Sequence, residues 1–196
     1  MKEKTHLGNR LLSVLLTFLM LLSLLPSAAL AADTQQIALM AVTQDGFLIE
    51  PEYVTYHSGD TVKDVLKKSG HTFSGIDNGY ITAVDGTTDN FSIHYDEDGY
   101  KLDQSADGLT AIWFTTNSDQ SHGANLQKLA ANMAVYNTAT NGLKDYKAAQ
   151  EAYDAAVKGF YAATDTKAKT LNDALFSAID KHAKFLEGKT TPLTIS

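Results

Sequence analysis

The pattern of apolar and polar positions changes within residues 46–70, and this stretch organises the first half of the chain. Over residues 47–56 the side chains alternate between two faces, as the two-residue period of a β-strand requires. One face is expected to carry Phe47, Ile49, Tyr53 and Thr55. Pro51 cannot donate to a strand ladder, so it marks an edge strand or a bulge.

A short helix is predicted directly after this strand. Its apolar residues Val62, Val65 and Leu66 have the i, i+3, i+4 spacing of one helix face. Asp60 is the predicted N-cap, because its carboxylate can accept hydrogen bonds from the free N–H groups of the first turn. Gly70 provides the expected C-terminal stop.

Continuous apolar runs at residues 36–43 and 109–114 predict two strands that are buried on both faces and central in a sheet. Shorter strands are predicted between them at residues 80–84, 91–95 and 100–102. Within the second of these, Ser92 and His94 alternate with apolar residues and are expected to face water. This element order is that of a β-grasp sheet, in which the first and last strands lie together in the centre and a helix covers one face.

Beyond a polar, glycine-containing stretch at residues 117–123, the apolar spacing is helical. Steps of three and four residues recur in three segments, at residues 126–136, 143–160 and 171–186. Gly188 is expected to end the last helix. The fold class is therefore α+β: a β-grasp-like mixed sheet with one helix, followed by a small antiparallel three-helix bundle with its own core.

The first 31 residues have the pattern of a secretory signal peptide. A basic start precedes an apolar stretch at residues 11–25 and a small-x-small site that ends at Ala31. The apolar stretch is shorter than the ~20 residues that a spanning helix needs, which argues against a membrane anchor. We therefore expect a secreted or cell-surface protein that is cleaved after Ala31.

The predicted organisation has four parts. They are a signal peptide at residues 1–31, a β-grasp domain at 36–117, a three-helix bundle at 124–188 and a final segment at 189–196. The final segment is expected to be a tail or the first strand of a further domain.

Charge and cysteine content disfavour several functions. The formal net charge is −7, and the chain after residue 31 carries −9, because the first 31 residues hold three basic residues and one acidic residue. This charge disfavours non-specific nucleic-acid binding. The absence of cysteine removes thiol catalysis, thiolate metal sites and lipoprotein anchoring. After residue 31 the sequence has no second long apolar segment, so we expect no membrane span once the signal peptide is cleaved.

Four segments of the first half carry a family pattern: Ile49-Glu50-Pro51, Gly59-Asp60-Thr61-Val62, Asp64-Val65-Leu66 and Tyr80 to Gly86. Together they resemble the transcobalamin-like C-terminal domain family, a β-grasp domain common in exported bacterial surface proteins. The resemblance covers about residues 36–117. The segments at residues 91–95 and Asp98-Gly99 depart from the Trp-containing strand and Asn-Gly turn that members usually show.

The helical half carries a second resemblance. Residues 146–153, YKAAQEAY, and residues 171–175, LNDAL, are similar to FIVAR-type three-helix modules of Gram-positive surface proteins. The two resemblances imply a modular, exported surface protein of a Gram-positive bacterium. We expect a non-enzymatic interaction or adhesion module with an extracellular protein, glycan or small-molecule ligand. The alternative is corrinoid-like small-molecule binding through the β-grasp domain, as the first resemblance implies.

No catalytic residue, metal ligand or cofactor is predicted, because the chain lacks nucleophile-elbow, metalloprotease and phosphate-loop motifs. His94, Asp96 and Asp98 have the alternation of a calcium-loop start. Ser105 stands where a bidentate Glu is expected, so an acidic turn is favoured over a calcium site.

Three histidines and three aromatic residues complete the candidates. His57 and His71 flank the predicted helix without a third ligand, so solvated loop histidines are favoured over a zinc or corrinoid-iron role. His182 lies on a helical stripe and is expected to be partly buried and hydrogen-bonded. Core packing is favoured over an exposed ligand platform for Tyr95, Trp113 and Phe114.

Overall fold

The computed structural model describes residues 34–95 and 101–190, which belong to one compact unit. The predicted signal peptide, the acidic turn at Asp96 and Asp98, and the segment after residue 190 lie outside the described residues. Within the described part of the chain, no helix is long and apolar enough to cross a membrane.

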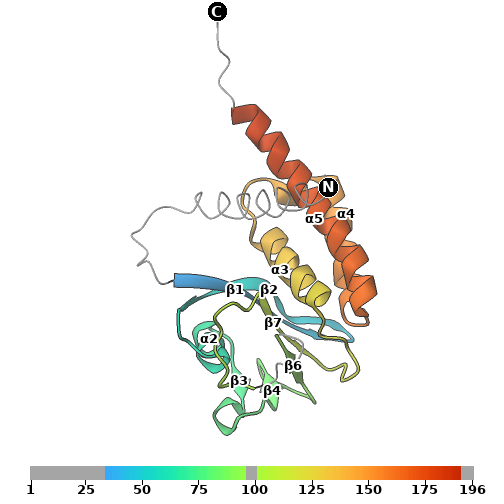
Figure 1. Cartoon of the computed structure of the whole chain (residues 1–196). Coiled ribbons are helices and arrows are strands. Elements are labelled where there is room, and N and C mark those ends of the chain that lie inside the picture. The colour runs from blue at the N-terminus through green and yellow to red at the C-terminus, as the bar shows by residue number, and fades with distance from the viewer. Residues whose placement is uncertain (1–33, 96–100, 191–196) are drawn as a thin grey trace, which may run out of the picture. The chain divides into compact units, whose positions relative to one another are not determined.

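Four strands form a mixed sheet in the order β2-β1-β7-β6 (Figure 1). The strands are β1 (Thr34–Thr43), β2 (Gly46–His57), β6 (Ser92–His94) and β7 (Ala111–Thr115). The central strands β1 and β7 pair in parallel, and β2 and β6 pair antiparallel at the two edges. The predicted β-grasp-like order is therefore confirmed, with the first and last strands together in the centre.

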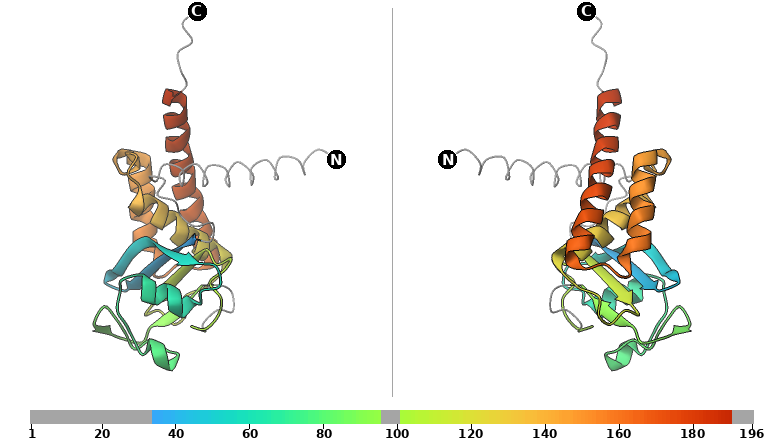
Figure 2. Two further views of the ribbon diagram at one scale, coloured as in Figure 1. Left: turned by 90° about the vertical axis from the view of Figure 1, so that its left-hand side faces the viewer. Right: turned by 90° about the vertical axis from the view of Figure 1, so that its right-hand side faces the viewer.

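Helix α2 (Val62–Lys68) covers one face of this sheet (Figure 2). Its three buried apolar residues pack in one cluster with Ile37 and Leu39 of β1 and with Ile112 and Phe114 of β7. Gly70 follows the helix with a φ of 85°, the left-handed conformation expected at a glycine stop. Apolar burial on this face holds the short helix, which is too short to be stable alone.

Three further helices cover the opposite face: α3 (Ala124–Thr138), α4 (Lys147–Phe160) and α5 (Asp165–Thr190) (Figure 1). Helix α3 contacts β1, β2 and β7, and α4 and α5 pack against α3. Met40 of β1 and Trp113 of β7 belong to the same buried cluster as Leu129 of α3 and Leu175 of α5. The sheet and the helices therefore share a core, which differs from the expectation of a separate core for the bundle.

The reason for the shared core is the burial of β1 and β7 on both faces, which the continuous apolar runs predict. A single short helix can cover only one of these faces. The second face needs another layer, and α3 provides it.

The three helices run alternately up and down. The first turns of α3 and α5 meet at Asn125 and Asp165, so these two helices run in the same direction. Helix α4 lies between them in the chain and runs in the opposite direction, as the predicted antiparallel bundle requires. Helix α5 continues through Gly188 to Thr190, so the predicted end at Gly188 is wrong, and it extends past the other two helices (Figure 2).

Strand β2 contains a bulge at its proline. From Leu39 to Ala41 β1 advances two residues, while the paired stretch of β2 advances three, from Ile49 to Glu52. Pro51 lies within this bulge, and β2 is an edge strand of the sheet. The prediction that Pro51 marks an edge strand or a bulge is therefore confirmed on both counts.

The irregular register also breaks the simple alternation of side chains along β2 between the two faces of the sheet. Ile49 packs with Val54 and Tyr56 on the α2 side, whereas Phe47 and Tyr53 pack on the side of α3. The predicted grouping of Ile49 with Phe47 and Tyr53 is therefore wrong, because an extra residue in one strand changes the face of the side chains beyond it.

A small antiparallel sheet lies beside α2 and consists of β3 (Phe73–Ser74), β4 (Ala83–Val84) and β5 (Thr87–Thr88). The strand predicted at residues 80–84 is thus limited to its last two residues. A short 3₁₀ turn, η1 (Ile76–Asn78), precedes it.

The predicted strand at residues 100–102 is not a strand at its described residues, Lys101 and Leu102. The Leu102 carbonyl instead accepts a hydrogen bond from the Lys63 N–H at 2.7 Å, and the Gln104 carbonyl accepts one from the Val62 N–H at 2.8 Å. This segment therefore satisfies free donors of the first turn of α2.

Candidate functional site

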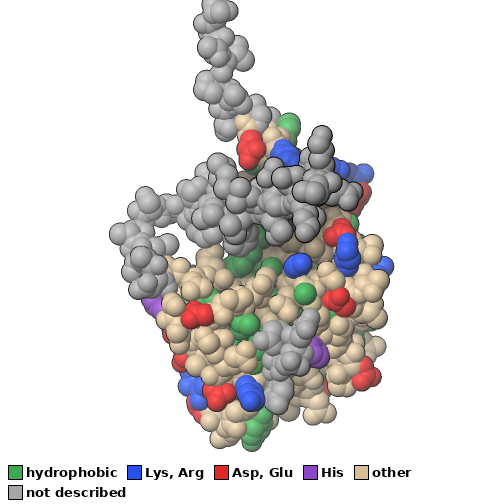
Figure 3. Space-filling view, in the orientation of Figure 1, with side chains coloured by type: hydrophobic (Ala, Val, Ile, Leu, Met, Phe, Trp, Pro, Cys, Tyr) green, Lys and Arg blue, Asp and Glu red, His purple; other side chains and the backbone are tan. Residues whose placement is uncertain are grey.

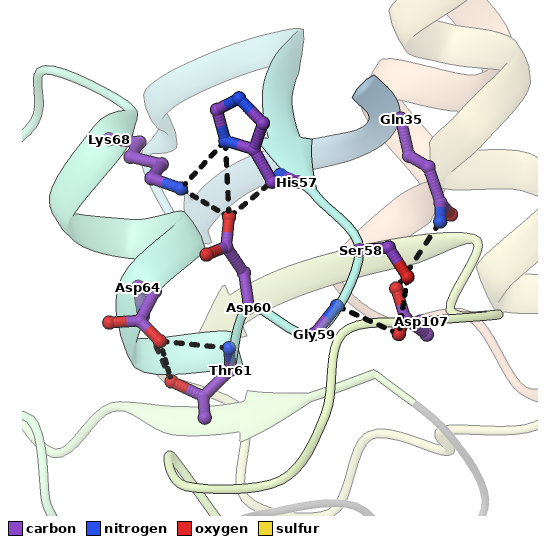
Figure 4. Close-up of polar contacts among 9 residues, drawn as sticks. All are labelled: Gln35, His57, Ser58, Gly59, Asp60, Thr61, Asp64, Lys68 and Asp107. Atoms are coloured by element: carbon purple, nitrogen blue, oxygen red, sulfur yellow. Dashed lines mark hydrogen bonds and ion pairs between the residues drawn. The ribbon is translucent and has the colours of Figure 1, made fainter. Parts of the chain in front are cut away.

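The turn between β2 and α2 is held by two aspartates (Figure 4). The Asp60 carboxylate accepts a hydrogen bond from the His57 backbone N–H at 2.7 Å and another from the Lys68 ammonium. The hydrogen bonds from Lys68 and then from His57 lower the pKa of Asp60. Asp60 therefore joins the end of β2 to the last turn of α2.

Thr61, rather than Asp60, caps helix α2. The Thr61 hydroxyl oxygen accepts from the Asp64 N–H at 3.2 Å, and the Asp64 carboxylate accepts from the Thr61 N–H at 2.9 Å. This is a reciprocal capping box, and its hydrogen bonds from Thr61 lower the pKa of Asp64. The N-cap prediction is wrong by one residue because the Asp60 carboxylate is engaged by His57 and Lys68.

Asp107 fastens a second loop to the same turn. Its carboxylate accepts hydrogen bonds from the Gly59 N–H at 2.9 Å and from the Ser58 hydroxyl at 3.2 Å (Figure 4). The Gln35 side-chain amide donates to the same carboxylate at 3.3 Å. From the sequence, Asp107-Gly108 is an ordinary Asp-Gly turn, so this contact was not predicted. The carboxylate oxygens of Asp60 and Asp107 thus accept hydrogen bonds that hold these loops in place.

His71 lies between two carboxylates. Its Nδ1 is 2.7 Å from Asp85 Oδ2, and its Nε2 is 3.2 Å from Glu52 Oε1. Burial opposes ionisation of Asp85, but hydrogen bonds from the Thr72 N–H and from His71 outweigh it and lower the pKa of Asp85. The imidazole therefore connects the edge strand β2 with the β4–β5 turn.

The two histidines that flank α2 have different surroundings. The His57 side chain is 61% exposed, as expected for a solvated loop histidine, whereas that of His71 is 26% exposed and engaged by carboxylates. His57 and His71 contact different side chains: His57 lies near Asp60 and Lys68, and His71 lies between Glu52 and Asp85. In the described residues, no group of three or more His, Asp or Glu side chains is arranged to hold a metal ion.

His94 is buried, although its position in the strand pattern predicts that it faces water. Its side chain is 8% exposed and stacks on Trp113, with ring centroids 5.3 Å apart, and on His122, at 5.4 Å. Burial, followed by the charge of His122, lowers the pKa of His94 to about 4. The prediction is wrong because the face of β6 that carries His94 is covered by the segment leading to α3.

That segment, residues 116–123, is fastened to the sheet and to the end of α4. Gln120 is 4% exposed, accepts a hydrogen bond from Trp113 Nε1 at 3.1 Å and donates one to the Phe160 carbonyl at 2.5 Å. The Asn117 amide donates to the Tyr161 carbonyl at 2.8 Å. Polar residues of the stretch that suggests a domain boundary therefore form the hydrogen bonds that hold this connection to the sheet and to α4.

The three candidate platform residues are all core residues. Tyr95, Trp113 and Phe114 are each 0% exposed, so core packing is confirmed and an exposed aromatic platform is excluded for them. Trp113 meets Phe160 of α4 edge to face at 6.1 Å, and Phe114 packs on Phe73 at 5.1 Å.

His182 has the role expected from its helical stripe. It is 8% exposed, its Nε2 lies 3.1 Å from the Asn141 carbonyl oxygen, and its ring stacks on Tyr146 at 5.6 Å. It joins α5 to the segment before α4. The prediction of a buried, hydrogen-bonded seam histidine is confirmed.

Several polar side chains with clear tertiary roles were not predicted: Gln120, Asn132, Asp165 and Asn172. Asn132 and Asn172 bond to each other between α3 and α5 at 2.7 Å. Asp165 follows an interruption of the helical spacing, which is the usual place for a capping residue, but its partner on another helix has no signal in the local sequence.

Acidic and basic side chains are scattered over the face shown in Figure 3 and do not gather into a large patch of one sign. Charge on this face therefore does not single out a binding surface. Comparison of the chain with protein-family models, with curated proteins and with solved structures gives no match.

Proposed function

We propose that the protein is an exported, non-enzymatic binding module of the bacterial cell surface. The observation that carries this proposal is that the carboxylates of Asp60 and Asp107 accept hydrogen bonds from the backbone of the β2–α2 turn and so hold that turn in place. The signal-peptide pattern and the resemblance to transcobalamin-like and FIVAR-type modules support the export and surface parts of the proposal.

The surface that we favour for binding is a pair of adjoining loops, residues 57–59 and 103–108. Most of their residues are exposed, including His57, Ser58 and Ser105. Asp107 connects the two loops, and Thr61 forms an isolated bridge with Ser105. Loops that are ordered before binding lose less conformational entropy when a ligand arrives, which favours affinity.

Binding by strand addition at β2 is less favoured. Both faces of the sheet are covered, so an extended peptide would have to pair with an edge. Pro51 has no N–H to offer, and its carbonyl already accepts a hydrogen bond from the Asn137 amide of α3 at 3.0 Å. The bulge at Pro51 and the neighbouring Glu50 further oppose pairing at this edge.

Binding to a glycan array and to Gram-positive cells tests the proposal. We expect saturable binding by the wild-type chain and weaker binding by Asp107→Ala, which loosens both loops. Lys147→Ala is the matched control, because the Lys147 side chain is 85% exposed and lies on α4, in the helical layer on the other face of the sheet. Wild-type binding no stronger than that of an unrelated acidic protein would argue against the proposal.

Titration with cobalamin tests the alternative of corrinoid binding. A saturable change in the absorbance of cobalamin would support it. An unchanged spectrum at millimolar concentration would exclude it and leave the interaction module as the remaining proposal.

A further inference from the structure

Four rings form a continuous series from α4 through the sheet to the segment before α3. Phe160 meets Trp113 edge to face at 6.1 Å, Trp113 stacks on His94 at 5.3 Å, and His94 stacks on His122 at 5.4 Å. His94 and Trp113 are directly opposite each other on β6 and β7. The two imidazoles are nearly parallel, with an angle of 16° between their planes.

His94 is poorly placed to carry a charge. It is 8% exposed, and its Nε2 has no hydrogen-bond partner among the described residues. A neutral imidazole can leave this nitrogen as an unused acceptor. A protonated imidazole must place an N–H donor there, and a buried donor without an acceptor is costly.

His122 adds a second cost. It is exposed and lies on the outer side of the stack, so it can exchange protons with water. When both rings are protonated, two like charges face each other across the stack. The remaining neighbour in the stack, Trp113, does not titrate.

We infer that the His94–His122 stack is an acid-sensitive latch between the sheet and the segment at residues 116–123. At neutral pH the uncharged rings stack and the segment covers His94 and Trp113. On acidification, proton uptake drives the His122 ring away from His94, which opens the outer part of the segment and admits water to His94. This inference does not depend on the proposed function, because it concerns no ligand.

The charged groups near the stack define the conditions for the test. The covering segment holds two titratable residues, Asp119 and His122, and of these it is His122 whose ring stacks on His94. The side that β7 presents carries Trp113, which is uncharged. Asp96, Glu97 and Asp98 follow His94 in the chain, outside the described residues. Measurements at low and at moderate salt separate the contact between the rings from such longer-range charges.

Trp113 is the single tryptophan of the chain, so its fluorescence reports on the stack directly. The full chain is titrated from pH 8 to pH 4 while tryptophan emission, its quenching by acrylamide and far-UV circular dichroism are recorded. We expect acrylamide quenching to rise on acidification, before any loss of helical signal. A rise in quenching that coincides with loss of the helical signal would mean global unfolding and would overturn the latch.

Two substitutions and one control complete the experiment. His122→Phe keeps a ring over His94 without a charge and should shift the transition to lower pH, and His94→Phe should abolish it. His57→Gln, which removes an exposed histidine outside the stack, should leave the transition unchanged. If His94→Phe does not fold, the pH of the quenching transition in His122→Phe tests the latch by itself. A wild-type transition in that variant would overturn the inference.

Discussion

Asp165, the first residue of α5, caps the start of α3 through Asn125. Its Oδ1 accepts a hydrogen bond from the Asn125 backbone N–H at 3.0 Å, and its Oδ2 accepts one from the Asn125 side-chain amide at 2.6 Å. The N-cap residue of α3 is Gly123, which has no side chain to perform this role. A Cβ at this glycine would overlap the Asp165 carboxylate. The cap is therefore tertiary and also sets where α3 and α5 meet.

Asp165→Ala should lower the free energy of unfolding by about 1–2 kcal/mol, because it removes an N-cap acceptor and leaves partly buried donors unpaired. Urea denaturation measures the change. Asp173→Ala is the control on the same helix, since Asp173 forms an exposed ion pair with Lys169 and should cost less than about 0.5 kcal/mol. Equal losses for the two variants would contradict the tertiary cap.

Gly75 and Gly79 form a matched pair on either side of η1. Both have a φ of 84°, so alanine at either position costs about 1 kcal/mol in backbone conformation. A Cβ at Gly75 would also lie 2.6 Å from the Tyr80 carbonyl oxygen, whereas a Cβ at Gly79 would meet nothing within 4 Å.

We therefore expect Gly75→Ala to be the more destabilising substitution, by about 1–3 kcal/mol over Gly79→Ala. Thermal denaturation of the two variants in parallel checks this difference. Similar melting temperatures would show that the loop around Tyr80 adjusts without strain.

The Asn132–Asn172 hydrogen bond should specify the pairing of α3 with α5. Asn172 is 9% exposed, so Asn132→Leu leaves a buried amide without its partner and should cost about 1–3 kcal/mol. Replacing both residues by Leu removes the orphaned amide and should cost less than the sum of the two single changes. A double-mutant cycle by urea denaturation measures this coupling, and strict additivity would show that the pair contributes little.

The lowered pKa of His94 makes stability fall as the pH falls. The folded-state pKa is about 4 and the unfolded reference is 6.5, so the unfolded state binds more protons between these values. From pH 8 to pH 5 this amounts to a loss of about 2 kcal/mol. It is an upper limit if the latch opens, because local opening lets His94 take up its proton without global unfolding.

Urea denaturation of the wild type and of His94→Phe at pH 8 and pH 5 measures this loss, and the variant should lose about 2 kcal/mol less. The lowered pKa values of Asp60, Asp64 and Asp85 act in the same direction at lower pH. Their contribution is present above the unfolded carboxyl pKa and is lost as the pH falls below it, so the range above pH 5 separates the effect of His94 from that of these carboxylates. The same pH dependence in both proteins would contradict the assignment.

Local patterns were sufficient for most elements of the fold. The apolar runs of β1 and β7 predicted central strands, and the spacing of Val62, Val65 and Leu66 predicted α2. These features are local because a side chain's face is set by the backbone period of its own element. Short strands were predicted less well, since two-residue ladders such as β3 and β4 depend on the partner strand more than on their own residues.

The polar sites were harder to predict because their partners are distant in the chain. Asp107 acts on a turn 48 residues earlier, and Asp165 acts on Asn125 of α3, 40 residues earlier. The prediction for Asp60 failed although its partners are only a few residues away. Its position suited an N-cap, but Lys68 engages its carboxylate and Thr61 takes over the cap.

The sequence by itself determined the α+β class and the order of the main strands and helices, because these depend on periodicity and turn residues. Only the tertiary structure decided that the helices close the second face of the sheet and share its core. The same packing decided that His94, polar by its strand pattern, is buried between Trp113 and His122. The physical reason is that the exposure of a strand face depends on what covers it, and the covering segment lies more than twenty residues further along the chain.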